Sequence, residues 1–384
     1  MQWRRTMSDQ NDTIENEELY EDAHVVQISK PFNPLDVDIV SQPLVLSNVF
    51  ERLSHDEIEL TPDFQRNPNL WNDVKQSRLI ESLIIRIPLP TFYFDGSNEN
   101  KWIVVDGLQR LWAMKRFVVE PTDSKNKLRL KNLEYLNEYE GCYFEDLPRD
   151  IQRRIKEQTI IAYLIRQGTP DKVRNSIFER INTGGMTLTP AEIKNSVYRG
   201  QAAQLLKEMA EYTSFLLATR NRISSNRMLD REFVNRFLSF YILSVNAYKG
   251  NLEEFLCDGL DTIKAAPAPF LEDYRKAFKQ AMELSYSLFE ENAFRKPFNQ
   301  ENKGIQNFGP INKPLFECIS VNLAQLSPEQ ARILIERKTP FIGAYLQLFK
   351  DNGFYQSISN ATGYEKNAKI RHMKFKELLE KVLA

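Results

Sequence analysis

A group of residues able to do chemistry stands within VVDGLQRLWAMKRF, residues 104–117, where a short apolar run passes into a segment with helical spacing. The first turn of a helix carries unpaired backbone N–H groups and a partial positive charge, and both attract phosphate. Gly107 would let the backbone approach such a ligand, and Arg110 would pair with its oxygens. Asp106 would hold Mg²⁺ or orient a water molecule, which Gln109 would position. The same residues also fit a purely structural interpretation, a turn followed by a buried Asp–Arg pair.

Two other short motifs could add ligand contacts. FQRN, residues 64–67, contains Gln65 and Arg66, and Arg66 would place a second guanidinium at the same phosphates. The alternative is a surface arginine that follows a strand. NTGG contains Asn182 and Thr183, an amide and a hydroxyl that could contact base, sugar or metal, although a helix C-cap also accounts for the two glycines.

The elements that must position these residues are predicted by hydrophobic pattern. From residue 43, segments with helical spacing alternate with β-branched and aromatic strands such as PLPTFYFD and KWIVVD. TPAE predicts a helix start, with Thr189 as N-cap and Glu192 completing a capping box. Beyond residue 200 strand signals vanish and amphipathic helices follow. We therefore expect an α+β chain: an acidic, largely disordered tail at 1–42, a mixed α/β domain at 43–199 and a helical domain at 200–384.

The motifs FQRN, LIESLIIRIPLPTFYF, IVVDGLQRLWAMKRF and IFERINTGGMTLTPAEIKNS occur in an order that resembles the DUF262 family. That family's signature is D-G-Q-Q-R, and Leu108 replaces its first Gln here. The resemblance implies a fold similar to ParB and sulfiredoxin, whose members bind a nucleoside triphosphate at a Gly and Arg turn. It also implies a role in phage defence, because the family includes the nucleotide-hydrolysing, DNA-sensing part of restriction systems that act on modified phage DNA.

Basic runs in the second half are candidates for contact with DNA phosphates. TRNRISSNRMLDREFVNR contains Arg220, Arg222 and Arg227, and EKNAKIRHMKFK contains Lys369 and Arg371. A solvated helix face is the alternative meaning of each run. The aromatic residues of FLSFY have helical spacing and are expected in the core rather than on a base-stacking platform.

Composition excludes several classes of protein. The chain has 51 basic and 52 acidic residues, so attraction to nucleic acid must come from local clusters. Its three cysteines lack C-x-x-C spacing, which argues against a zinc site or a redox motif, and its three histidines are too far apart for a histidine-rich metal centre. The sequence has neither a P-loop nor an HNH-type metal motif, which argues against a P-loop hydrolase and an HNH nuclease. The sequence has no apolar run long enough to span a membrane and no secretory signal, so a cytoplasmic location is expected.

Three functions remain open from the sequence. The first is a nucleoside triphosphate hydrolase that uses Mg²⁺, with Asp106 and Gln109 acting on water and Arg110 and Arg66 stabilising charge on the phosphoryl group. The second is a DNA glycosylase that excises a modified base with the same Asp106. The third is a catalytically silent DNA-sensing module that recruits a separate nuclease.

Overall fold

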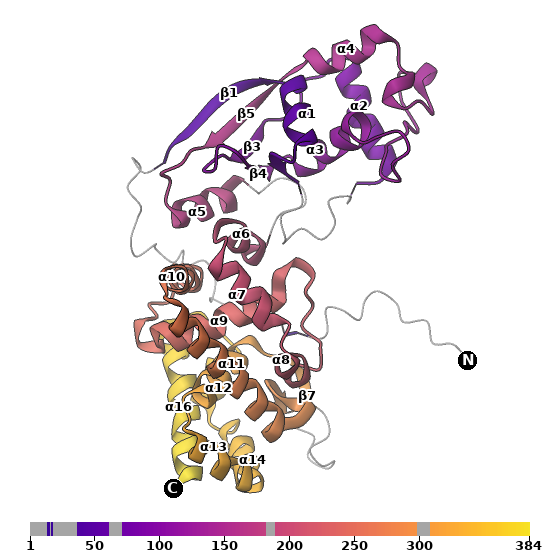
Figure 1. The fold of residues 1–384 in the computed structure, drawn as a ribbon. Helices are drawn as coiled ribbons and strands as arrows, with labels where there is room; N and C mark the ends of the chain where they lie inside the picture. The colour runs from indigo at the N-terminus through magenta and orange to yellow at the C-terminus, as the bar shows by residue number, and fades with distance from the viewer. Residues whose placement is uncertain (1–13, 16, 18–36, 61–70, 182–188, 298–307) are drawn as a thin grey trace, which may run out of the picture. The chain divides into compact units, whose positions relative to one another are not determined.

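The chain folds into two compact units. A computed structural model describes residues 14, 15, 17, 37–60, 71–181, 189–297 and 308–384. Its internal contacts group residues 31–197 into one unit and residues 198–384 together with 1–30 into the other. The first unit is mixed α/β and the second is mostly helical (Figure 1). The predicted α+β class, with an α/β region before a helical region, is confirmed.

The α/β unit contains one five-stranded sheet in its described part. Its described strands are β1 (Ile39–Val45), β2 (Ile58–Glu59), β3 (Phe92–Asp95), β4 (Trp102–Asp106) and β5 (Thr159–Ile165), in the order β1-β5-β3-β4-β2. The β1–β5 and β3–β4 pairs are antiparallel, whereas β3–β5 and β2–β4 are parallel. A shift of register in β3, between Tyr93 and Phe94, places Tyr93 opposite Asp106 at the end of β4.

One face of this sheet carries the core of the α/β unit. Phe92 and Phe94 of β3 and Val104 of β4 are at most 2% exposed and pack with the apolar faces of the nearby helices. Strand side chains alternate between the two faces, so the aromatic residues of PLPTFYFD divide between core and opposite face. The helices on the core side are α1 (Leu46–Ser54), α2 (Asp73–Ile84), α3 (Leu108–Met114) with the π-helical turn η3 (Lys115–Val119), and α4 (Arg149–Glu157).

Helix α2 anchors the connection that follows α3 through a buried acid. Glu81 is 2% exposed, and its carboxylate accepts the backbone N–H groups of Glu134, Tyr135 and Leu136 at 2.7–3.1 Å. Burial by itself would raise the pKa of Glu81, but these N–H groups hold it below its usual value. The connection contains two short 3-10 turns, η4 (Asn137–Tyr139) and η5 (Phe144–Asp146).

The opposite face of the sheet meets α5 (Asp171–Ile181), which is followed by α6 (Pro190–Val197). Arg174 of α5 donates to Asp95 of β3 at 3.1 Å, and this pairing fixes the helix on the sheet. The predicted capping box at the start of α6 is confirmed: the Thr189 N–H donates to Glu192 at 2.7 Å, and the Glu192 N–H donates to the Thr189 hydroxyl at 3.2 Å.

The second unit is built on helices around an aromatic core. Phe233 and Phe316 lie 4.9 Å apart between ring centroids, and Phe237 and Phe278 lie 5.0 Å apart. Phe237 and Phe240 of FLSFY are fully buried, as predicted, whereas Tyr241 is only partly buried. The helices of the described part are α7 (Gln201–Ala210), α8 (Thr213–Ala218), η6 (Asn226–Met228), α9 (Leu229–Leu243), η7 (Val245–Ala247), α10 (Leu252–Ala265), α11 (Ala268–Phe289), η8 (Glu290–Asn292), α12 (Lys313–Ala324), α13 (Pro328–Glu336), α14 (Lys338–Leu348), α15 (Asn352–Ser357) and α16 (Glu365–Leu383).

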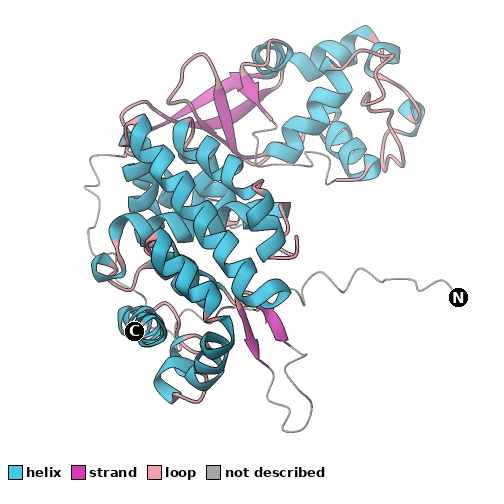
Figure 2. Cartoon of the chain, turned by 60° about the horizontal axis from the view of Figure 1, so that its bottom comes forward, coloured by secondary structure: helices cyan, strands magenta, loops and turns pink. Residues whose placement is uncertain are grey.

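A small sheet in the helical unit departs from the prediction that strands end near residue 200. Strands β6 (Arg295–Pro297) and β7 (Phe308–Ile311) pair antiparallel, and Figure 2 distinguishes them by colour from the surrounding helices. Each strand is short and contains a proline, so its local pattern predicts no strand. Pairing between the two segments, and not intrinsic preference, decides this structure.

A network of buried charges holds α9, α12 and α16 together. Glu317 of α12 is fully buried and accepts from Arg371 of α16 at 2.7 Å and from Arg236 of α9 at 3.3 Å. Arg236 also donates to Glu17 at 2.7 Å, and the second oxygen of Glu17 accepts the Thr362 hydroxyl at 3.0 Å. Each charge therefore has an opposite partner in a place that water does not reach.

The N-terminal region differs from the expected free tail in two places. Glu15 accepts from Lys296 at 2.6 Å and from Asn312 at 3.0 Å, and its N–H donates to the Ile311 carbonyl at 2.8 Å. Farther along, residues 39–42 belong to strand β1. The acidic composition predicts a solvated segment, but Glu15 and Glu17 instead pair with Lys296 and Arg236 of the helical unit, more than two hundred residues away in sequence.

Candidate functional site

The predicted site lies where β4 ends and α3 begins. Strand β4 ends at Asp106, Gly107 follows with φ +98°, and α3 starts at Leu108. This φ lies in the left-handed region, which favours glycine. A Cβ at Gly107 would stand 2.4 Å from the Phe92 ring and 3.3 Å from Nη2 of Arg110, so the corner also needs the space that glycine leaves.

Arg110 is directed into the corner and held there. Its Nη1 donates to the Pro90 carbonyl, and its Nη2 donates to the Thr91 carbonyl at 3.1 Å and to Asp106 Oδ2 at 2.8 Å. Its guanidinium lies 4.3 Å above the Phe92 ring, and its side chain is 11% exposed. Burial lowers the pKa of Arg110, and the Asp106 charge opposes that shift. Arg110 is thus engaged with protein groups, and its geometry is that of a residue that positions Asp106.

Asp106 keeps one oxygen for a ligand. Oδ2 takes the Arg110 bond, whereas Oδ1 has no hydrogen-bond partner within the part of the chain that the structure describes, and the side chain is 32% exposed. Gln109, in the first turn of α3, accepts the Trp71 N–H through Oε1 at 3.2 Å. The corner can therefore present a fixed carboxylate oxygen to a metal, a water molecule or a hydroxyl group, with Gln109 linking it to the segment before α2.

Two tyrosines missed by the sequence analysis lie on β3 and β5, level with the end of β4 in the sheet. Tyr93 stands opposite Asp106 in the β3–β4 ladder, and Tyr163 of β5 stacks on Tyr93 with ring centroids 5.0 Å apart. Both side chains are partly exposed. The alternation of PLPTFYFD marks Tyr93 as a residue of the face opposite the core, but its neighbour Tyr163 could be found only from the strand order.

The remaining predicted nucleotide contacts cannot be placed. Gln65, Arg66, Asn182 and Thr183 all lie outside the described residues. Among the described residues, no group of three or more His, Cys, Asp or Glu side chains could hold a metal ion. Magnesium commonly takes most of its ligands from phosphate oxygens and water, so a single carboxylate such as Asp106 could hold it.

The predicted DNA contacts divide into exposed and buried groups. Arg220 pairs with Glu291 at 2.9 Å and is 44% exposed, and Arg222 and Arg227 are exposed. Burial lowers the pKa of Arg295, and the like charges of Arg220 and Arg222 lower it further. These three arginines therefore form a cluster.

The two predicted contacts on α16 have opposite surroundings. Lys369 is 41% exposed and pairs with Glu365 one turn before it. The prediction that Arg371 contacts DNA is wrong. Its side chain is 2% exposed, pairs with Glu317 and donates hydrogen bonds to the carbonyls of Ser357 and Thr362. It lies in the core because α16 turns this position toward α12, and it is not placed to contact DNA.

Comparison with known families matches one of the two units. Residues 46–199 match the family described as GmrSD restriction endonuclease, N-terminal domain. The match contains the Asp106 to Arg110 corner and covers nearly all of the α/β unit. No curated protein and no solved structure matches the chain. Across the described residues, no helix has the length and apolar character needed to cross a membrane.

Proposed function

We propose that this chain is a component of a phage-restriction system and that its α/β unit binds and hydrolyses a nucleoside triphosphate at the Asp106 corner. The observation that carries the proposal is the match of residues 46–199 to the restriction endonuclease N-terminal domain, since it contains this corner. The local geometry supports it independently, because Arg110 holds Oδ2 of Asp106 and Oδ1 is left available to a ligand.

In this scheme Arg110 acts through Asp106. Its bond to Asp106 Oδ2 and its bonds to the Pro90 and Thr91 carbonyls fix the direction in which Oδ1 points. Asp106 would hold Mg²⁺, which would neutralise the phosphate charge when bound, or would orient the attacking water. Tyr93 and Tyr163 would offer an aromatic surface to the base. The DNA substrate proposed for the whole system is modified phage DNA.

The test is turnover by the full chain with Mg²⁺ and each common nucleoside triphosphate, measured as released phosphate. Asp106→Asn keeps the shape of the side chain, and we expect it to lower turnover by about 10²-fold or more. Asp56→Asn is the matched control, because Asp56 is 86% exposed in the same unit. Arg110→Lys should lose turnover with the fold retained, since lysine keeps the charge but cannot bridge both carbonyls and Asp106. Wild-type turnover in Asp106→Asn would refute the assignment.

The same proteins discriminate the two alternative functions. Incubation with hydroxymethylated or glucosylated phage DNA in the absence of nucleotide would produce abasic sites if Asp106 served a glycosylase. DNA binding without turnover of either substrate would instead favour a sensing module that recruits a separate nuclease.

A further inference from the structure

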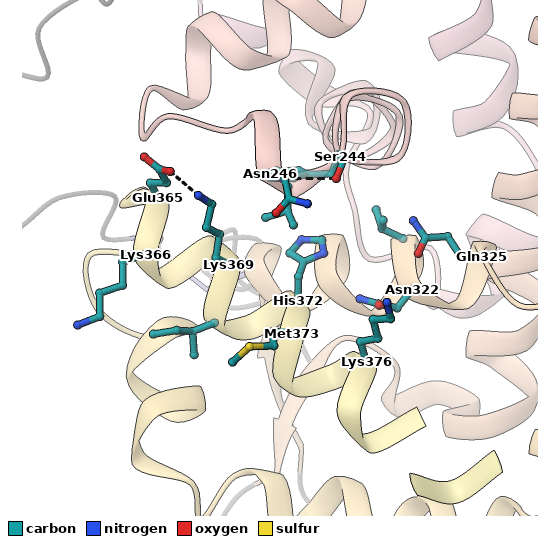
Figure 3. Close-up of a pocket in the computed structure, with 14 residues that line it drawn as sticks. Ser244, Asn246, Asn322, Gln325, Glu365, Lys366, Lys369, His372, Met373 and Lys376 are labelled. Carbon is teal, nitrogen blue, oxygen red and sulfur yellow. Dashed lines mark hydrogen bonds and ion pairs between the residues drawn. The ribbon is translucent and has the colours of Figure 1, made fainter. Parts of the chain in front are cut away.

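The helical unit contains a cavity that the proposed function does not use. It has a volume of about 870 Å³ and lies between η7, α12 and α16 (Figure 3). This size is in the range of small-molecule sites. Part of its wall is apolar, with Phe240, Val321, Ile370 and Met373, and Met373 is 50% exposed.

The charged side chains of the cavity are mainly basic. Lys366, Lys369 and Lys376 of α16 line it together with one acid, Glu365, so three positive charges and one negative charge leave a formal charge of +2. Glu365 is already paired with Lys369. Lys376 pairs with Glu380 at 3.9 Å, and both of these side chains are about two-thirds exposed, so that pair is weak. An anionic group would therefore find cations at this wall.

A buried histidine on the same wall has an unused nitrogen. His372 is 6% exposed, its ring lies 5.3 Å from that of Phe240, and its Nε2 is buried without a hydrogen-bond partner among the described residues. Burial, reinforced by the Arg371 charge, lowers the pKa of His372 to about 3, so the ring is neutral near pH 7. A buried polar atom without a partner is unfavourable, and a hydrogen bond with a ligand group would remove this cost.

Side-chain amides surround this histidine. Figure 3 shows Asn246 above His372, with Asn322 and Gln325 to one side near the end of Lys376. Asn322 donates through Nδ2 to the Cys318 carbonyl at 2.7 Å, which leaves its carbonyl oxygen as an acceptor. Amides present a donor and an acceptor together, and this is the pattern that recognises the edge of a nucleobase.

We infer that this cavity binds a nucleotide, with the phosphate at Lys376 and the base among the amides beside His372. Lysines alone would suit any anion, but the combination of cations, amides and an apolar wall matches the phosphate, the base edge and the flat face of one nucleotide unit. The ligand is either a free nucleotide or a nucleotide within a single strand of nucleic acid. The site belongs to the helical unit and does not depend on the Asp106 corner.

The first test is binding of a fluorescently labelled single-stranded oligonucleotide to the full chain, with unlabelled deoxynucleotide monophosphates and inorganic phosphate as competitors. The variant Lys376→Glu reverses an exposed charge of the cavity. We expect at least about tenfold weaker binding at low salt, and a salt dependence reduced by about 0.7, from one phosphate contact. Competition by the mononucleotide supports a free nucleotide as ligand, whereas binding of the oligonucleotide alone supports a nucleic-acid strand.

The control variant is Lys381→Glu, which makes the same change of charge at an exposed lysine outside the cavity. The second measurement is local: the methyl NMR signal of Met373, assigned with Met373→Leu, should shift when nucleotide binds. Equal loss of binding in Lys376→Glu and Lys381→Glu would overturn the proposal, as would binding that leaves the Met373 signal in place. Competition by inorganic phosphate as strong as that by the mononucleotide would overturn the assignment of a base site.

Discussion

Arg110 with Asp106, and Arg371 with Glu317, are two arginine–carboxylate pairs in very different surroundings. In the α/β unit, the Asp106 side chain is 32% exposed and retains one oxygen without a partner among the described residues. In the helical unit, Glu317 is fully buried and both of its oxygens accept from arginines. The residue types do not distinguish a site from a structural pair. The number of oxygens left for a ligand does.

The energetics of the two pairs differ for the same reason. Burial raises the pKa of Glu317, and the charges of Arg371 and Arg236 oppose this shift, so its ionised form depends on both arginines. Asp106 remains in contact with solvent, which screens its interaction with Arg110. Loss of Arg110 should therefore lower the free energy of unfolding less than loss of Arg371 does.

The largest effect on stability is expected from Arg371→Met. This change leaves Glu317 buried with Arg236 alone and removes the bonds to Ser357 and Thr362, which should lower the free energy of unfolding by about 3–5 kcal/mol. Arg332→Met is the control, because Arg332 forms ion pairs while 59% exposed and should lose less than about 1 kcal/mol. Urea unfolding followed by helical circular dichroism measures both. Equal stability of the two variants would remove the distinction between buried and exposed pairs.

An intermediate effect is expected from Gly107→Ala. The positive φ would strain alanine by about 1–3 kcal/mol, and the new Cβ would also meet the Phe92 ring on which Arg110 lies. Gly168→Ala provides a matched control, since Gly168 has φ +109° and no atom lies within 4 Å of the place that its new Cβ would take. Thermal unfolding should show a larger loss for Gly107→Ala. A loss of stability no greater than in Gly168→Ala would mean that Phe92 and Arg110 can move aside for the new Cβ without destabilising the fold.

The smallest effect is a dependence on pH in the helical unit. The pKa of His372 falls from an ordinary 6.5 to about 3 on folding, so the unfolded chain binds a proton first as pH decreases. Stability should fall from pH 6.5 downward, by about 2 kcal/mol at pH 5, and His372→Phe should remove this part of the loss. His55→Phe changes an exposed histidine and should leave the profile unaltered. Parallel profiles for wild type and His372→Phe would contradict the prediction.

Local sequence patterns determined the elements and the corner. The capping box of Thr189 and Glu192, the helical second half and the transition from strand to helix at Gly107 all follow from residue type and spacing within a few positions. Such features depend on backbone conformations and hydrogen bonds between near neighbours, which a short stretch of sequence specifies. The same locality makes Asp106 and Arg110, one helical turn apart, recognisable as a pair.

Tertiary structure decided the role of each charge. Lys369 and Arg371 stand two positions apart in one basic run, yet the first is partly exposed and the second is buried against Glu317. The carboxylate of Glu17 meets Arg236 across more than two hundred residues of sequence. Whether a charge contacts solvent, a ligand or a buried partner depends on which elements pack around it, and this packing is set by the burial of apolar side chains far apart in the chain.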